Sequence, residues 1–75
     1  MPERFTIEDL FREIEGEFPS YRALEQRVIA LFNEHLQDFP PHYSYRDAIT
    51  WADRQRWLQP LNGGFRVELA HAGAF

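Results

Sequence analysis

The hydrophobic pattern of the chain changes its period once, near residue 58, and this change limits the folds that are open to it. Before residue 58, apolar side chains recur every three or four positions, which is typical of amphipathic helices. After it, residues 65–69 alternate between apolar and polar, which is typical of a strand with one buried face. The Asn62-Gly63 step between two apolar segments indicates a tight hairpin with a type I′ turn, which needs two positive φ values. The sequence therefore predicts helices followed by a C-terminal β-hairpin.

Capping residues and prolines set the bounds of the predicted elements. Thr6 and Ser44 each precede an aspartate by three positions, a variant of the capping box, and Ser20 is placed to cap the second helix. Pro19 and the Pro40-Pro41 pair end the first two helices, because the residue before a proline is pushed out of the α region. The predicted elements are helices over about 7–16, 20–38 and 45–57, a hairpin over about 58–69, and a loose tail over 70–75.

The length of 75 residues suits one small domain that spans 1–75 and lies near the lower limit of independent stability. There are no cysteines, so neither disulfides nor thiolate-bound zinc can stabilise it. Aromatic burial is the remaining source of stability, and the predicted core contains Phe11, Phe18, Phe32, Trp57 and Phe65. The expected fold class is mainly α, a three-helix bundle followed by a hairpin in a winged-helix-like arrangement.

No residue pattern indicates catalysis or a metal centre. Glu34, His35 and Asp38 share one predicted helical turn, but a useful metal site needs three or four converging ligands, and we interpret the group as a solvated helix edge. Ser20 and Ser44 are the only serines, and both are explained as helix caps. A domain of this size also has little room for a ligand pocket. We therefore predict no enzyme, no cofactor and no metal.

The charge distribution disfavours nucleic acid but leaves one DNA-binding hypothesis open. The net charge is −4, and all eight basic residues are arginines. Residues 1–40 have a net charge of −5 (nine acids, four arginines), whereas residues 41–75 have +1 (three acids, four arginines). Helix 45–57 and the hairpin therefore form the predicted working face for either a protein or a DNA partner, and its candidate contact residues are Arg46, Thr50, Trp51, Arg54, Arg56, Asn62 and Arg66.

A protein partner is the preferred hypothesis, because more aromatic residues are present than the predicted core needs. Tyr21, Tyr43 and Tyr45 are candidates for an aromatic interface beside Trp51, since Tyr, Trp and Arg are enriched at binding hot spots. The acidic first half and mildly basic second half would also suit head-to-tail self-association.

Three short segments carry a resemblance to a known family. They are Phe18–Val28 (Phe-Pro-Ser-Tyr-Arg-Ala-Leu-Glu-Gln-Arg-Val), then Asn33–Leu36, then Ile49–Leu58 with its Trp51-Ala52 pair. Over about residues 7–61 the chain resembles the effector-associated domains of bacterial conflict systems. The resemblance implies a small, death-fold-like helical adaptor as the alternative fold, with a protein partner bound through like-with-like contacts.

Taken together, the sequence predicts a non-enzymatic, bacterial protein-interaction or adaptor module, with a winged-helix DNA-binding regulator as the alternative. No apolar run reaches the roughly 18 residues that a membrane-spanning helix needs, so no membrane is expected. The first residues lack the order of a signal peptide, and a cytoplasmic location is expected.

Overall fold

The computed structural model describes residues 4–69, which form three α-helices, one short 3₁₀ helix and three strands. In chain order these are α1 (Ile7–Glu13), β1 (Gly16–Phe18), α2 (Tyr21–Glu34), the 3₁₀ turn η1 (Leu36–Asp38), α3 (Tyr45–Arg54), β2 (Leu58–Leu61) and β3 (Gly64–Val67). The predicted tail, 70–75, lies outside the described residues.

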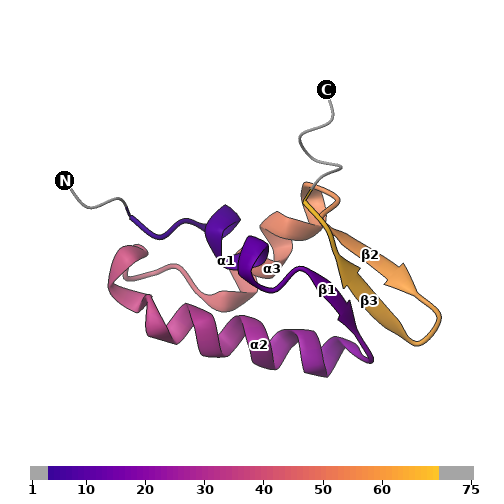
Figure 1. The fold of residues 1–75 in the computed structure, drawn as a ribbon. Helices are drawn as coiled ribbons and strands as arrows, with labels where there is room; N and C mark the ends of the chain where they lie inside the picture. Colours follow the sequence, from indigo (N-terminus) through magenta and orange to yellow (C-terminus); the bar gives the residue numbers. More distant parts are fainter. Residues whose placement is uncertain (1–3, 70–75) are drawn as a thin grey trace.

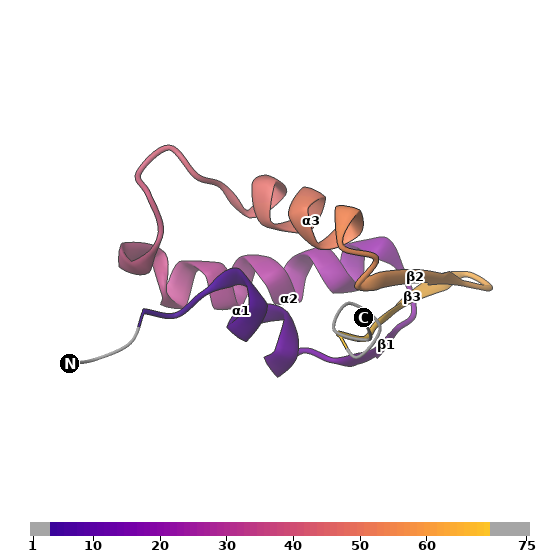
Figure 2. The same cartoon turned by 90° about the horizontal axis from the view of Figure 1, so that it is seen from above.

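The long helix α2 forms the base of the domain, and α1 and α3 lie across it (Figure 1). Seen from above, α1 and α3 flank α2 on opposite sides, and the sheet closes one end of the helical group (Figure 2). The β2–β3 hairpin projects beyond that end (Figure 2). This arrangement leaves α1 and α3 side by side above α2, with the sheet at the end of the space between them.

The sheet has three strands, one more than the sequence predicted. β1 pairs with β3 in antiparallel register, Glu17 opposite Arg66 and Phe18 opposite Phe65, and the strand order is β1-β3-β2. The prediction of helix up to residue 16 is therefore wrong: α1 ends at Glu13, and Gly16, with a φ of +136°, begins the strand instead. Glycine takes this backbone conformation without steric cost, which lets the chain turn sharply out of the helix.

The other helices begin where predicted and end earlier. Ser20 caps α2, and its hydroxyl accepts a hydrogen bond from the Ala23 amide at 3.1 Å. α2 ends at Glu34 rather than near 38, and the chain continues as the 3₁₀ turn. α3 begins after Ser44 as predicted but ends at Arg54 rather than at 57.

The end of α3 is a Schellman motif built on an arginine. The Trp57 amide donates to the Ala52 carbonyl and the Arg56 amide to the Asp53 carbonyl, each at 3.0 Å. Arg56 has a φ of +64°, the left-handed conformation in which glycine is the usual residue. Arg56 is the one non-glycine residue with positive φ within residues 4–69.

The predicted hairpin is confirmed, but its turn is of another type. Gly63 has a φ of +87°, whereas Asn62 is not among the residues with positive φ, so the turn is not type I′. A positive φ at the third turn position alone is what a type II turn requires. The next residue, Gly64, lies against β1: a Cβ added there would stand 2.1 Å from the carbonyl oxygen of Phe18. Only glycine therefore allows the hairpin to approach β1 this closely.

The core lies between α2 and the layer formed by α1, α3 and the sheet. Of the five predicted core aromatics, Phe11, Phe32 and Trp57 are buried, and Phe18 and Phe65 are partly buried against them. The full buried set is Leu10, Phe11, Ile14, Leu24, Val28, Leu31, Phe32, Ala48, Ile49, Ala52, Trp57, Leu58, Val67 and Leu69.

The fold is thus a small domain of three helices and a three-stranded antiparallel sheet. The expected class, mainly α, describes this fold only in part. Because residues 4–69 include a three-stranded sheet, the alternative of a purely helical domain is wrong. Each helix within those residues is too short or too polar to span a membrane.

Candidate functional site

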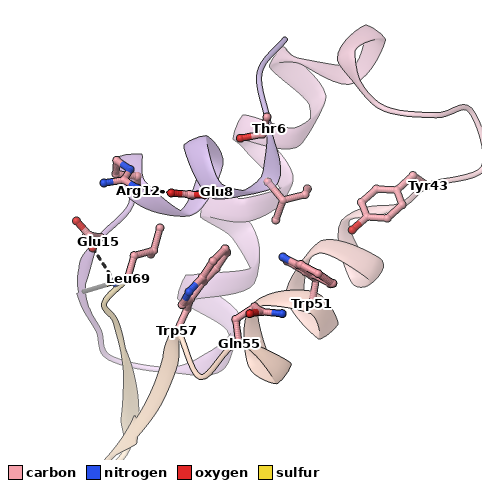
Figure 3. A pocket seen from close by; sticks show the side chains of 10 residues that line it. Thr6, Glu8, Arg12, Glu15, Tyr43, Trp51, Gln55, Trp57 and Leu69 are labelled. Atoms are coloured by element: carbon pink, nitrogen blue, oxygen red, sulfur yellow. Dashed lines mark hydrogen bonds and ion pairs between the residues drawn. The ribbon is translucent and has the colours of Figure 1, made fainter. Parts of the chain in front are cut away.

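An open groove with a volume of about 910 Å³ lies between α1 and α3. Its size contradicts the expectation that so short a chain has little room for a pocket. Its described walls are Thr6, Ile7, Glu8, Arg12, Glu15, Tyr43, Trp51, Gln55, Trp57 and Leu69. α1 and α3 both pack on α2, and the groove lies between them (Figure 3).

Two tryptophans give the groove its apolar character. Trp57 follows the Schellman turn and stands between Leu69 and Gln55 at the centre of the groove (Figure 3). Its side chain is only 6% exposed, and its indole nitrogen is the one buried side-chain polar atom within residues 4–69 that has no hydrogen-bond partner. Trp51, on α3, is 48% exposed, so roughly half of a large apolar ring faces solvent. Tryptophan is among the residue types enriched at binding hot spots.

The α1 side of the groove is acidic. Glu8 forms an ion pair with Arg12 one helical turn away. Glu15 accepts a hydrogen bond from the Leu69 amide at 2.8 Å, and this contact ties the end of α1 to the end of the sheet (Figure 3). No charged side chain lines the groove from α3 among the described residues. The groove therefore has one acidic wall and one aromatic wall.

The predicted contact residues of α3 lie on its exposed side. Arg46, Thr50 and Arg54 are exposed, as is Arg56 just beyond the helix. Hydrogen bonding with Tyr45 is the main reason that the pKa of Arg46 is raised. Arg54 and Arg56 share a second, smaller hollow of about 520 Å³ with Asp53 and the edge strand β2.

The two predicted contact residues of the hairpin, Arg66 and Asn62, differ in how far they are free to contact a partner. Arg66 bonds to Glu17 on β1 at 2.8 Å, directly across the sheet, so its charge is already matched. Asn62 is exposed at the hairpin tip. Asp47, at the start of α3, accepts from the Ser44 amide at 2.9 Å, and its side chain is exposed.

The three tyrosines do not form one cluster. Tyr21 is 45% exposed, contacts the edge of Phe65, and lies near Tyr45, Arg46 and Glu25; burial is the main reason that its pKa is raised. Tyr43 belongs to a separate group, in which its ring packs on Phe32 and Phe39. Only Tyr43 shares the groove with Trp51.

The metal interpretation gains no support. His35 lies 3.7 Å from Asp38 and stacks on Phe5, and no group of three potential ligands exists within residues 4–69. No family model, curated protein or solved structure matches this chain.

Sequence reasoning identified Trp51 but missed the wall that faces it. Ile7, Glu15 and Leu69 are distant from Trp51 in the chain, and only the tertiary packing brings them into the same groove. No local sequence pattern identifies them as groove residues, because each fits the periodicity or capping of its own segment and gives no sign of a contact with distant residues.

Proposed function

We propose that the chain is a protein-interaction module that binds its partner in the groove between α1 and α3. The observation that carries this is Trp51, half exposed at the edge of an open groove whose walls also include Trp57 and Tyr43. Burying the exposed half of such a ring is the kind of contact that dominates interface energies. A module of this kind performs no chemistry and needs no cofactor.

The scaffold is proposed to be a winged helix. What supports this is the order of elements, with a strand between α1 and α2 that pairs with the last strand, and a hairpin directly after α3. In that architecture α3 is the recognition helix and the β2–β3 hairpin is the wing. Fold alone does not assign a function, because the same scaffold serves both DNA and protein partners.

DNA binding is the second candidate, and the observation that favours it is the pair Arg54 and Arg56, neither of which has a carboxylate partner among the described ion pairs. The electrostatics oppose it. Arg66 is already paired with Glu17, and Asp47 and Asp53 are exposed on or beside α3. Since phosphate contacts dominate DNA affinity, a face with so few free cations binds DNA weakly.

The adaptor role implied by the resemblance to bacterial effector-associated domains is kept as part of the proposal, with homotypic association as one version of it. A cytoplasmic location belongs to the same proposal. It is supported by the absence of cysteines, which suits a reducing compartment.

The test compares two exposed apolar side chains of similar accessibility. The intact chain is used as bait in extracts of the producing cell, beside Trp51→Ala and Leu36→Ala variants, since Leu36 is 54% exposed and lies outside the groove. We expect Trp51→Ala to lose a partner that Leu36→Ala retains. Retention of every partner by Trp51→Ala would contradict the proposal. Tight binding of random duplex DNA at about 50 mM salt, lost in Arg54→Glu/Arg56→Glu, would favour the regulator.

A further inference from the structure

We infer that the groove between α1 and α3 is specific for a basic amphipathic segment of the partner protein, with apolar side chains against Trp51 and Arg or Lys side chains along α1. This rests on the proposed function and names the chemistry of the partner. The groove lies between two helices, and an amphipathic helix laid into such a groove is a common way of binding peptides.

The α1 side of the groove has a negative net charge. Between residues 7 and 15 the chain has four acids, Glu8, Asp9, Glu13 and Glu15, and one base, Arg12, for a local net charge of −3. Of these, Glu8, Arg12 and Glu15 line the groove itself: Glu8 pairs with Arg12, and Glu15 accepts from the Leu69 amide through one carboxylate oxygen. Asp9, which accepts from the Thr6 amide, and Glu13 are exposed on α1 outside the lining residues, so the groove and its α1 border have a net negative charge. An acidic occupant would meet like charge here, whereas Arg or Lys side chains would be attracted.

The α3 side of the groove has no charged lining residue among those described. Trp51 and Gln55 line the groove from α3 without charge, so the partner needs no acidic residue on that side. The electron-rich face of a tryptophan also attracts the cationic end of Arg or Lys, which adds to the same preference.

The buried indole of Trp57, at the centre of the groove, is a feature that does not depend on charge. Trp57 is more than nine-tenths buried, projects into the groove (Figure 3), and has an indole N–H without a hydrogen-bond partner. An unsatisfied buried donor is costly, and native proteins leave few of them. The indole nitrogen is buried, so a carbonyl oxygen of an occupant would reach this donor only if the ring moves.

A second copy of the chain is a poorer occupant. The arginines of α3, Arg46 and Arg54, project from a helix whose apolar side is buried in its own core. Besides Trp51, the exposed residues of α3 are polar, so the helix offers little apolar surface to the groove of a second copy.

The experiment titrates the intact, ¹⁵N-labelled chain with two synthetic peptides of about 15 residues, a length at which a helix is marginally stable alone. Both carry Leu at helical spacing; one has Arg and the other Glu at the remaining positions. The two indole N–H resonances report on Trp51 and Trp57. We expect the Arg peptide to shift both and the Glu peptide to shift neither, with binding by the Arg peptide weakening as salt is raised.

Matched charge variants make the test specific. Glu8→Gln/Glu15→Gln removes two charges from the groove and retains an amide oxygen for the Leu69 amide. Glu25→Gln/Glu34→Gln removes two charges from α2, which does not line the groove. We expect about fivefold weaker binding for the first pair and no comparable change for the second.

Three results would overturn the inference: equal effects of the two pairs, equal binding of both peptides, or no shift with either peptide. Equal binding of both peptides through Trp51 would leave the groove as a protein-binding site and refute only its charge preference. Absence of any peptide binding together with arginine-dependent DNA binding would refute the proposed function itself.

Discussion

Replacing Gly64 by alanine tests whether β1 really joins the hairpin. The added Cβ would lie 2.1 Å from the Phe18 carbonyl oxygen and 3.0 Å from the Pro19 carbonyl carbon, both backbone atoms that cannot rotate away. β1 and β3 must therefore separate by about 1 Å where Phe18 faces Phe65. Overpacking of this kind costs about 1–3 kcal/mol, and a backbone neighbour places it near the upper end.

Alanine also reduces the conformational entropy of the unfolded chain, which stabilises the folded state by about 0.4–1 kcal/mol. The net loss in the free energy of unfolding is then about 2 kcal/mol, out of about 4–11 kcal/mol expected for a domain of this length. With a urea dependence of about 1 kcal/mol/M, the unfolding midpoint should fall by about 2 M. The assay is urea unfolding followed by tryptophan fluorescence and far-ultraviolet circular dichroism.

Gly63→Asn is the matched control, because nothing lies within 4 Å of its added Cβ and asparagine tolerates a positive φ. It should cost less than about 1 kcal/mol. A Gly64→Ala variant as stable as the parent chain would refute the close approach of β1, and the sheet would then consist of the hairpin alone.

Three further substitutions test local features of the fold. Arg56→Gly should raise the free energy of unfolding by about 0.5–1 kcal/mol, because φ is +64° there; a loss of stability in thermal or urea unfolding would contradict this. Glu15→Ala should lower it by about 1.5 kcal/mol through loss of the acceptor for the Leu69 amide, whereas Glu15→Gln should restore most of it; equal losses in the two variants would show that the hydrogen bond is not the cause. Asp47→Ala should lower it by about 1 kcal/mol, because the Ser44 amide loses its partner at the start of α3, and unchanged urea unfolding would show that this cap contributes nothing.

The elements that sequence predicted well are those with a local signal. Thr6, Ser20 and Ser44 were expected to cap helices, and all three precede helices in the structure. Trp51 was expected among the contact residues on the surface of helix 45–57, and it is half exposed. These outcomes depend on hydrogen bonds and side-chain spacing within a few residues, which a sequence displays directly.

The candidate site was only half predictable. One wall follows from the helical spacing of Trp51, but the other, with Ile7 and Glu15, comes from a helix that lies about 40 residues away in the chain. The tyrosines show the same limit, since their separation into two groups depends on how α2 and α3 pack.

The change of hydrophobic period near residue 58 is enough to predict that helices precede a hairpin, because alternation and an Asn-Gly turn are local properties. Only the tertiary structure decided that Gly16–Phe18 is a third strand. Three residues are too few to show a period, and their strand conformation depends on the pairing of Glu17 with Arg66, 49 positions later, and on the absence of a side chain at Gly64. That long-range pairing places the sheet at the end of the helices and leaves the groove between α1 and α3.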